Sequence, residues 1–216
     1  MKSFSELKRI HRALRDSFDE NFSIRMHRSL SWLNKSEMET DPDAKFIFLW
    51  IAFNAAYSSS TKSFSISCDE ELRTDFFKLL LIKGNIEIHK IIWERYSSEI
   101  RSILNNEFIL RVFWENQIDS NSDWKSKLTH EKKEVERALI DKKDTIYILL
   151  ILFKRLYVLR NQMFHGGATW QGKLNRRQVN DGAKILSHLV PIFLDVMMSN
   201  PNEDWGPLTY PPMNED

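Results

Sequence analysis

The scarcity of helix-breaking residues constrains the fold of this chain more than any other feature. The 216 residues contain only six glycines and six prolines, and four of the prolines follow residue 200. Glycine and proline interrupt helices and form the tight turns on which β folds depend. Seven Trp and fourteen Phe also make the chain unlike a disordered one. The sequence therefore predicts an all-α fold, a multi-helix bundle with long antiparallel core helices.

Apolar spacing and capping residues divide the chain into helices. No segment is typical of a β-strand, and no internal repeat or domain boundary is visible. We therefore expect a single helical domain at residues 1–199, with inserted middle helices at 69–140, and an irregular Pro-rich tail at 200–216. The helices are expected at 3–38 with a break near 19–23, and at 42–58, 69–83, 88–105, 107–117, 124–140, 144–163 and 175–199.

Charge and composition limit the partners that the chain can have. The net charge is +1, so any contact with RNA must come from a local basic patch. The longest apolar run, Ile146 to Phe153, is far shorter than the ~20 residues that span a bilayer. The first residues lead into a charged amphipathic helix, unlike a signal peptide. The one cysteine, Cys68, suits a reducing compartment and is expected to be a small core or loop residue. The sequence thus predicts a cytoplasmic protein without a membrane partner.

The first expected helix has a basic face opposite its apolar row. Two interpretations fit this pattern: a solvated charged face, or a surface that meets RNA phosphates. The residues concerned are Lys8, Arg9, Arg12, Arg15, Arg25 and Arg28.

The second expected helix, at 42–58, is apolar nearly all round and should lie in the core. Trp50, Phe53, Asn54 and Tyr57 share one of its faces, by their spacing of i, i+3, i+4 and i+7. An asparagine in that setting must find hydrogen-bond partners or cost the fold roughly 1–3 kcal/mol. Asn54 is therefore either a satisfied core residue that links two helices or a candidate substrate-binding residue.

The helix expected at 144–163 is apolar on every side over 146–153, which demands cover from neighbouring helices or from a partner subunit. It ends in Arg160-Asn161-Gln162-Met163-Phe164-His165, followed by Gly166-Gly167. The guanidinium fork of Arg160 matches phosphate, and the imidazole of His165 can transfer a proton near neutral pH. Asn161 can donate to phosphate or orient the imidazole. A structural interpretation also exists, because cations favour helix C-termini and histidine before glycine suits a cap.

Helix geometry restricts how these groups can cooperate. Five residues on a regular helix rotate by about 140°, so Arg160 and His165 do not share a face if the helix continues through both. Either the helix unwinds before Gly166, or a second copy completes the site.

Cutting RNA without a metal ion requires a base, an acid and a cation that offsets the charge of the transition state. Arg160, Asn161 and His165 offer such groups, and Lys173, Arg176 and Arg177 beyond the glycines are candidates for phosphate contacts. The chain has no cysteine–histidine or His-Glu-x-x-His spacing and no Gly-rich phosphate loop, so neither a metal nor a cofactor is expected.

Three segments together resemble the HEPN (higher eukaryotes and prokaryotes nucleotide-binding) domain family, in its stand-alone bacterial form. They are Arg160-Asn161-x3-His165, Trp50-x2-Phe53-Asn54-x2-Tyr57, and the ending 190–198 with the Asn-Pro and Asp-Trp-Gly-Pro sequences that follow it; roughly 58–141 is unmatched. The resemblance implies a HEPN-like bundle with Arg160 and His165 as the catalytic pair. It further implies a homodimer with a composite site, and RNA products with 2′,3′-cyclic phosphate and 5′-hydroxyl ends.

Three hypotheses follow from the sequence. The first is an endoribonuclease of HEPN type that acts as a toxin or phage-defence effector, with RNA as substrate and an antitoxin as a possible partner. The second is a non-catalytic HEPN module that binds nucleotide, RNA or protein. The third is an unrelated helical scaffold, in which Arg160 and His165 lie apart or form other salt bridges.

Overall fold

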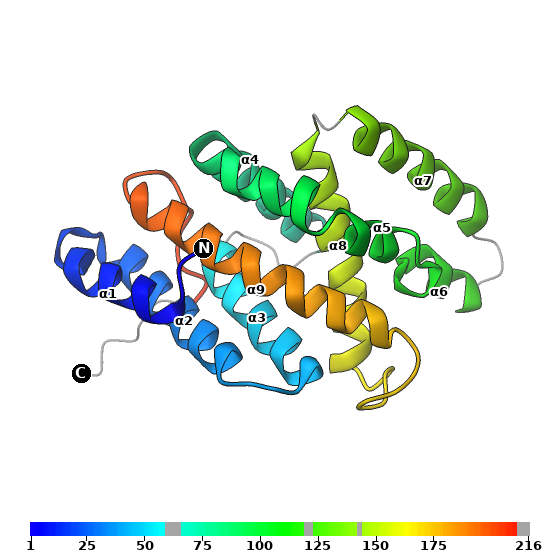
Figure 1. Ribbon diagram of the computed structural model, residues 1–216, viewed down its shortest axis with the longest axis horizontal. Helices are drawn as coiled ribbons and strands as arrows, with labels where there is room; N and C mark the ends of the chain where they lie inside the picture. Colours follow the sequence, from blue (N-terminus) through cyan, green and yellow to red (C-terminus); the bar gives the residue numbers. More distant parts are fainter. Residues whose placement is uncertain (59–65, 119–122, 142–143, 211–216) are drawn as a thin grey trace. The chain divides into compact units, whose positions relative to one another are not determined.

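The computed structural model describes residues 1–58, 66–118, 123–141 and 144–210. Over these residues the chain forms nine α-helices and no β-strand, so the prediction of an all-α bundle is confirmed (Figure 1). The chain divides into two compact units, each described here by itself. Unit 1 comprises Met1–Asn85 with Leu186–Asp216, and unit 2 comprises Ile86–Ile185. The single domain at 1–199 and its likeness to HEPN stay predictions.

Unit 1 is built on an N-terminal helical hairpin followed by a third helix. Its elements are α1 (Phe4–Leu14), a 3-10 turn η1 (Arg15–Ser17), α2 (Glu20–Glu37), α3 (Pro42–Tyr57), α4 (Ile66–Lys90) as far as Asn85, and α9 (Arg176–Ser199) from Leu186. Ser3 and Glu6 form a capping box that starts α1, and Asp19 accepts from the backbone N–H groups of Asn21 and Phe22 to start α2. The expected break therefore occurs slightly earlier than 19–23.

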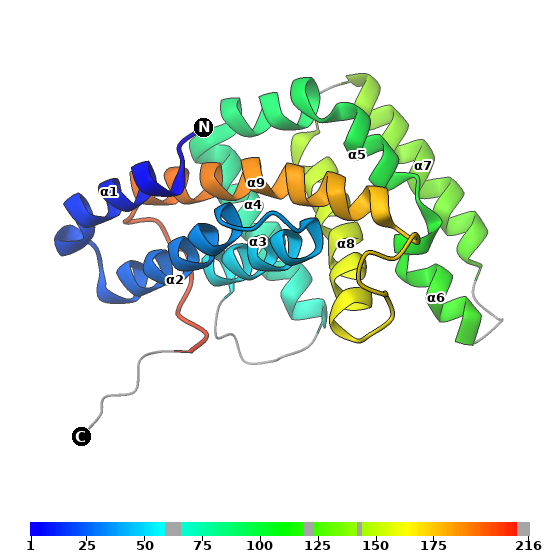
Figure 2. The ribbon, with the colours of Figure 1, turned by 60° about the horizontal axis from the view of Figure 1, so that its bottom comes forward.

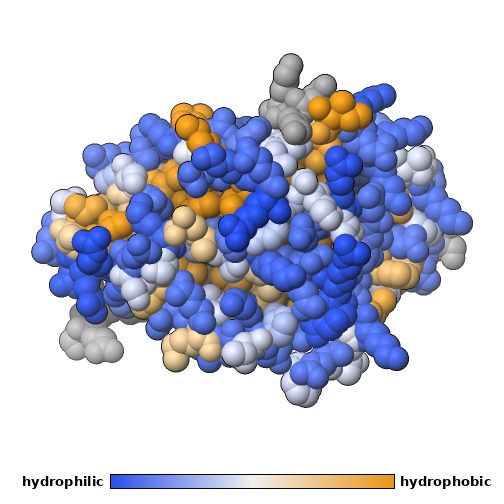
Figure 3. Space-filling view, in the orientation of Figure 1, coloured by the Kyte–Doolittle hydropathy of each residue, from blue (hydrophilic) through white to orange (hydrophobic). Residues whose placement is uncertain are grey.

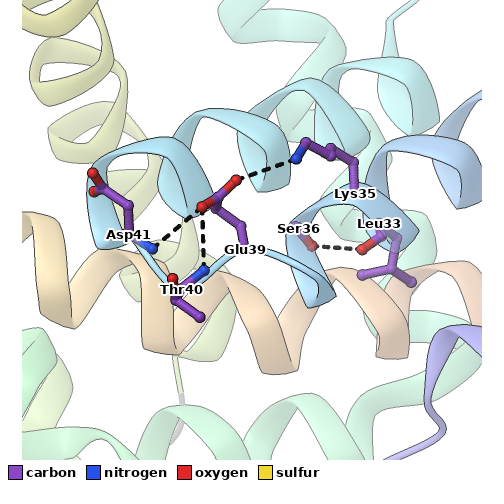
Figure 4. Close-up of polar contacts among 6 residues, drawn as sticks. All are labelled: Leu33, Lys35, Ser36, Glu39, Thr40 and Asp41. Carbon is purple, nitrogen blue, oxygen red and sulfur yellow. Dashed lines mark hydrogen bonds and ion pairs between the residues drawn. The ribbon is translucent and has the colours of Figure 1, made fainter.

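The connection between α2 and α3 is fixed by one carboxylate. Glu39 accepts from the backbone N–H groups of Thr40 and Asp41 at 3.2 and 3.4 Å and from Lys35 Nζ at 3.3 Å (Figure 4). These bonds, led by the one from Lys35, hold the pKa of Glu39 below its ordinary value. Asp41 then caps α3, whose first residue is Pro42. As a result α2 and α3 lie side by side (Figure 2).

Aromatic rings form the centre of unit 1. The centroids of Phe53 from α3, Phe76 and Phe77 from α4, and Phe193 from α9 lie 5.9–6.3 Å from one another. The buried ring of Trp205 packs on Phe76 at 5.9 Å, so the segment after α9 is anchored in this core. Such edge and offset contacts add to the hydrophobic gain from burying the rings.

Arg25 corrects one sequence interpretation. It was placed on the basic outer face of the first helix, but it is 1% exposed. Its Nη1 donates to Ala56 O and Ser58 O, both at 2.8 Å. Its Nη2 donates to Gly206 O at 2.6 Å and Pro207 O at 3.0 Å. Burial lowers the pKa of Arg25 to about 10, which still leaves it protonated at neutral pH. One cation therefore joins α2, the carbonyl end of α3 and the C-terminal segment.

Gly84 interrupts α4 at the position where the sequence predicted the end of one helix before the next. Its φ of −148° and ψ of 39° are non-helical, so α4 consists of two helical segments that meet at a kink, the second of which ends at Lys90. A Cβ at this position would overlap the side chain of Val196 on α9. The glycine is thus required by the close approach of α9.

Unit 2 surrounds α8. Its elements are the end of α4, a π-helical turn η2 (Ile91–Arg95), α5 (Ser97–Leu104), a 3-10 turn η3 (Glu107–Ile109), α6 (Arg111–Ile118), α7 (Trp124–Asp141), α8 (Thr145–Phe164) and the start of α9. The helix α8 packs against η2, α5, η3 and α7. Trp93 Nε1 donates to Thr145 Oγ1 at 2.9 Å, which ties η2 to the first residue of α8.

Three sequence predictions depend on residues of which the structure says little or nothing. The side chain of Cys68, the polar loop residues 59–63 and the tail from 211 lie outside the described part.

Among the described residues α9 is the one helix long and apolar enough to cross a bilayer, but most of its apolar stretch is buried, as in a core helix. Hydrophilic side chains dominate the face shown in Figure 3. The cytoplasmic location stays a prediction.

Candidate functional site

The helix α8 carries the three predicted catalytic residues at its C-terminal end. Asp144 starts the helix by accepting from Tyr147 N at 2.9 Å. The helix stays regular to Phe164, and the N–H of His165 still bonds Asn161 O at 2.9 Å. Gly166 then adopts a left-handed φ of 71°, and Ala168 N donates to Gln162 O at 2.9 Å. This is the geometry by which a glycine ends a helix, so α8 does not unwind before His165.

Arg160 is half-buried and held by two neighbours on its own helix. Its guanidinium lies 4.0 Å from the ring centroid of Phe164, and its Nη1 donates to Asn161 Oδ1 at 2.9 Å. The buried Nε atom of Arg160 has no hydrogen-bond partner among the described residues. Asn161 thus orients the guanidinium rather than the imidazole.

His165 is exposed, and its ring forms no hydrogen bond or ion pair with the described residues. Because α8 is regular between them, Arg160 and His165 diverge by about 140° around the helix axis. No hydrogen bond or ring contact joins the two side chains within one chain. Of the two ways to bring them together that the sequence left open, unwinding of α8 before Gly166 is not observed, and completion by a second copy stays a prediction.

A network of three carboxamides supports this end of α8. Gln162 Nε2 donates to Phe108 O at 2.6 Å, and Gln162 Oε1 accepts from Asn175 Nδ2 at 2.8 Å. Asn175 Oδ1 in turn accepts from Asn106 Nδ2 at 3.2 Å. Asn175 is buried, has a φ of 58°, and precedes the first residue of α9. The network therefore fixes both ends of the 165–175 loop to η3.

The predicted phosphate-binding residues lie on this loop and on the first turn of α9. Lys173 and Arg177 are exposed, whereas Arg176 is half-buried. Arg177 Nε forms an ion pair with Asp181 Oδ2 at 3.5 Å. Burial raises the pKa of Asp181, while Lys184 and Arg177 act against that shift. The structure thus brings these cations into the same unit as Arg160 and His165.

Asn54 belongs to unit 1, whereas the other predicted site residues belong to unit 2. It is half-buried on α3, and its buried Oδ1 has no hydrogen-bond partner among the described residues. The interpretation of Asn54 as a core residue with all its hydrogen bonds made is therefore wrong, because its side-chain carbonyl oxygen accepts none from the described residues. An unpaired buried acceptor costs about 1–3 kcal/mol.

The chain itself covers most of the apolar part of α8. Ile148, Leu149, Leu152 and Phe153 are fully buried. Arg155 on the same helix is also buried; its Nη2 donates to Glu131 Oε2 at 2.7 Å, and burial lowers its pKa while Glu131 opposes the shift. The cover that the sequence demanded thus comes from neighbouring helices, and a second copy is not needed for that purpose.

Sequence reasoning missed the carboxamide network and the buried arginines. Gln162 lies inside the motif that was singled out, but an amide on a helix gives no indication of its partner. Asn175 carried a usable signal, because asparagine directly before a helix often caps it or adopts positive φ. Arg155 carried a weaker signal, a cation two residues after the apolar run that ends at Phe153.

Comparison with known proteins adds no relative: no protein-family model, no curated protein and no solved structure matches this chain. The resemblance to HEPN domains therefore rests on the three segments quoted above.

Proposed function

We propose that this chain is a metal-independent endoribonuclease of HEPN type, acting in the cytoplasm as a toxin or phage-defence effector. One observation supports the proposal most. The exposed imidazole of His165 forms no bond with the described residues and lies at the end of the helix that holds Arg160. The exposed cations Lys173 and Arg177 follow within the same unit. Proton transfer and phosphate neutralisation are the two capacities that RNA cleavage requires.

The chemistry assigned to these groups is a transesterification. A neutral His165 takes the proton of a ribose 2′-hydroxyl, and the 2′-oxygen attacks the adjacent phosphorus. The bond to the 5′-oxygen breaks, and a protonated imidazole gives that oxygen a proton. The products are a 2′,3′-cyclic phosphate and a 5′-hydroxyl. Arg160 offsets the negative charge that builds up on the non-bridging oxygens.

A second copy of the chain is part of this proposal. Within one chain the two side chains diverge around α8, and only one imidazole is present at this helix end. A twofold dimer would supply Arg160 and His165 from both copies, so that one imidazole acts as base and the other as acid. RNA then contacts Lys173, Arg176 and Arg177 at the rim of the site.

A non-catalytic HEPN module is the alternative, and one observation favours it. Arg160 is directed at Phe164 and Asn161 rather than at His165. A guanidinium held in this way suits the binding of RNA or nucleotide without turnover. An antitoxin or another protein partner remains compatible with either function.

Two assays test the proposal: cleavage of RNA by the purified protein, and inhibition of growth in cells that express it. His165→Ala and Arg160→Ala are each expected to lower cleavage by about 100-fold or more, in line with the loss of an acid–base or charge-stabilising group. His130→Ala and Arg101→Ala are matched controls, because both residues are exposed on other helices of unit 2. RNA binding without cleavage by the unsubstituted chain would favour the alternative, and cleavage that survives both site substitutions would overturn the proposal.

A further inference from the structure

The N-terminal hairpin of α1 and α2 carries a second group of cations, in unit 1. Lys8, Arg12 and Arg15 follow one another at i, i+4 and i+7, so they line one side of α1 and its 3-10 extension. The helix α2 contributes His27, whose Nδ1 accepts from Lys8 Nζ at 3.2 Å. These four residues are called the hairpin cluster below.

The positive charge of the hairpin cluster is poorly neutralised by the protein itself. Lys8 and Arg12 form no ion pair with a carboxylate of the described residues. Arg15 is paired only with its neighbour Asp16, at 3.6 Å and in an exposed position. Among the described residues, Lys8 Nζ bonds only to an imidazole, which must be neutral to accept the bond. Like charges held together without a counterion are destabilising unless an anion joins them.

A buried histidine next to the hairpin cluster, His11, supplies an independent observation. His11 is 3% exposed, and its ring lies 6.5 Å from that of His27. Its Nε2 bonds Ser23 O at 3.3 Å, whereas its Nδ1 is buried without a partner among the described residues. Burial lowers the pKa of Lys8 and of His27, and nearby cations lower both further. An anion at the hairpin cluster would act against both shifts, because it favours the protonated forms.

We propose that the hairpin cluster of Lys8, Arg12, Arg15 and His27 is an accessory binding site for the phosphate backbone of single-stranded RNA. The choice of RNA rests on the proposed function. Two of the four groups are guanidiniums, which grip phosphate oxygens bidentately. Lys8, Arg12 and Arg15 are separated along the helix axis by about 6 and 4.5 Å. This spacing suits a chain of repeated anions better than one small ion. The site holds RNA without contacting the bond that is cut.

Equilibrium binding of a labelled single-stranded RNA oligonucleotide, read by fluorescence anisotropy, tests this site. The full-length His165→Ala protein is used so that the RNA stays intact. Replacing Lys8, Arg12 and Arg15 together by alanine is expected to weaken binding about tenfold or more near physiological salt. The slope of log Kd against log salt should also fall by about 2, since each single-strand phosphate contact contributes roughly 0.7.

Matched variants separate this effect from loss of charge or of fold. Replacing the exposed Lys127, Lys133 and Lys154 by alanine removes the same charge elsewhere and should change the affinity less than about threefold. The double variant Arg12→Ala/Arg15→Ala keeps the bond between Lys8 and His27 and should show an intermediate loss. It preserves the test if the triple variant does not fold, as judged by helical circular dichroism.

The outcomes distinguish this inference from the proposed function. Equal losses in the hairpin and control variants, or no RNA binding at all, would overturn the inference. Binding of phosphatidylserine vesicles that needs the hairpin cluster, with RNA binding unchanged, would overturn it too. RNA binding that depends on the hairpin cluster in a chain that cuts no RNA would leave the inference standing and remove the proposed ribonuclease activity.

Discussion

Replacing Arg25 by alanine is expected to destabilise unit 1. The loss should exceed that from an alanine substitution at any other arginine, or at any exposed residue, of the hairpin of α1 and α2. The substitution removes four hydrogen bonds, to carbonyls of Ala56, Ser58, Gly206 and Pro207, at 2.6–3.0 Å. It leaves these acceptors without their donor and opens a cavity where the side chain lay.

The magnitude follows from the balance of these terms. A hydrogen bond to a charged group contributes roughly 1.5–3 kcal/mol, and the desolvation of the guanidinium offsets part of the sum. We expect a net loss of about 3–5 kcal/mol, a large fraction of the roughly 5–15 kcal/mol that stabilises a typical domain. Arg25→Lys keeps the charge, but one ammonium cannot reproduce the planar fork between two pairs of carbonyls. Its expected cost is about 2 kcal/mol.

Urea unfolding followed by tryptophan fluorescence measures the effect. Arg28→Ala is the control, because Arg28 lies on the same helix and makes one exposed bond, from Nη1 to Tyr210 O at 2.6 Å. Its expected cost is below about 1 kcal/mol. The reasoning is refuted if Arg25→Ala and Arg28→Ala unfold at the same urea concentration with unchanged slopes.

Three further predictions concern packing, the 165–175 loop and pH. Gly84→Val should cost about 1–3 kcal/mol in urea unfolding because of the clash with Val196, whereas Gly167→Ala should cost less than about 1 kcal/mol; equal effects would contradict the account of the kink. Gln162→Ala should speed limited proteolysis within 165–175, since it removes the bonds to Phe108 O and to Asn175 Nδ2 and leaves the side chain of Asn175 held by Asn106 alone; an unchanged cleavage rate would count against that role. Burial holds the pKa of His11 below its ordinary value, so the unfolded chain binds a proton first on acidification. The unfolding free energy should therefore fall as the pH drops below about 6.5, and less steeply in His11→Gln; equal pH profiles would refute this assignment.

The sequence predicted the helices well because each depends on local signals. Apolar spacing, the caps at Ser3, Asp41 and Asp144, and the glycine after His165 all act within a few residues of the element that they define. The interruption expected at Gly84 is confirmed, because the backbone is non-helical there, but the tertiary reason for a glycine could not be read from the sequence. There the absence of a side chain serves the contact with Val196.

Contacts distant in sequence were beyond such reasoning. Arg25 was predicted to lie on an exposed face because the face of the first helix was extended past the break. The 3-10 turn before Asp19 changes which side of the next helix faces the solvent. Its carbonyl partners lie up to 182 residues away, and no spacing rule identifies them. The polar end of α8 was found because a cation and an imidazole stand out after an apolar run. The role of Gln162 in holding it could not be found, since its partners come from η3 and the start of α9.

The chemical identity of the RNA ends tests the central claim most directly, that an imidazole and a guanidinium at the end of α8 cut RNA by proton and phosphate chemistry alone. The purified chain is incubated with RNA in the presence of EDTA, and the new ends are analysed by mass spectrometry. The account predicts 2′,3′-cyclic phosphate and 5′-hydroxyl ends that disappear in His165→Ala. Ends of another kind, cleavage that stops on chelation, or cyclic phosphate ends that persist in His165→Ala would contradict it.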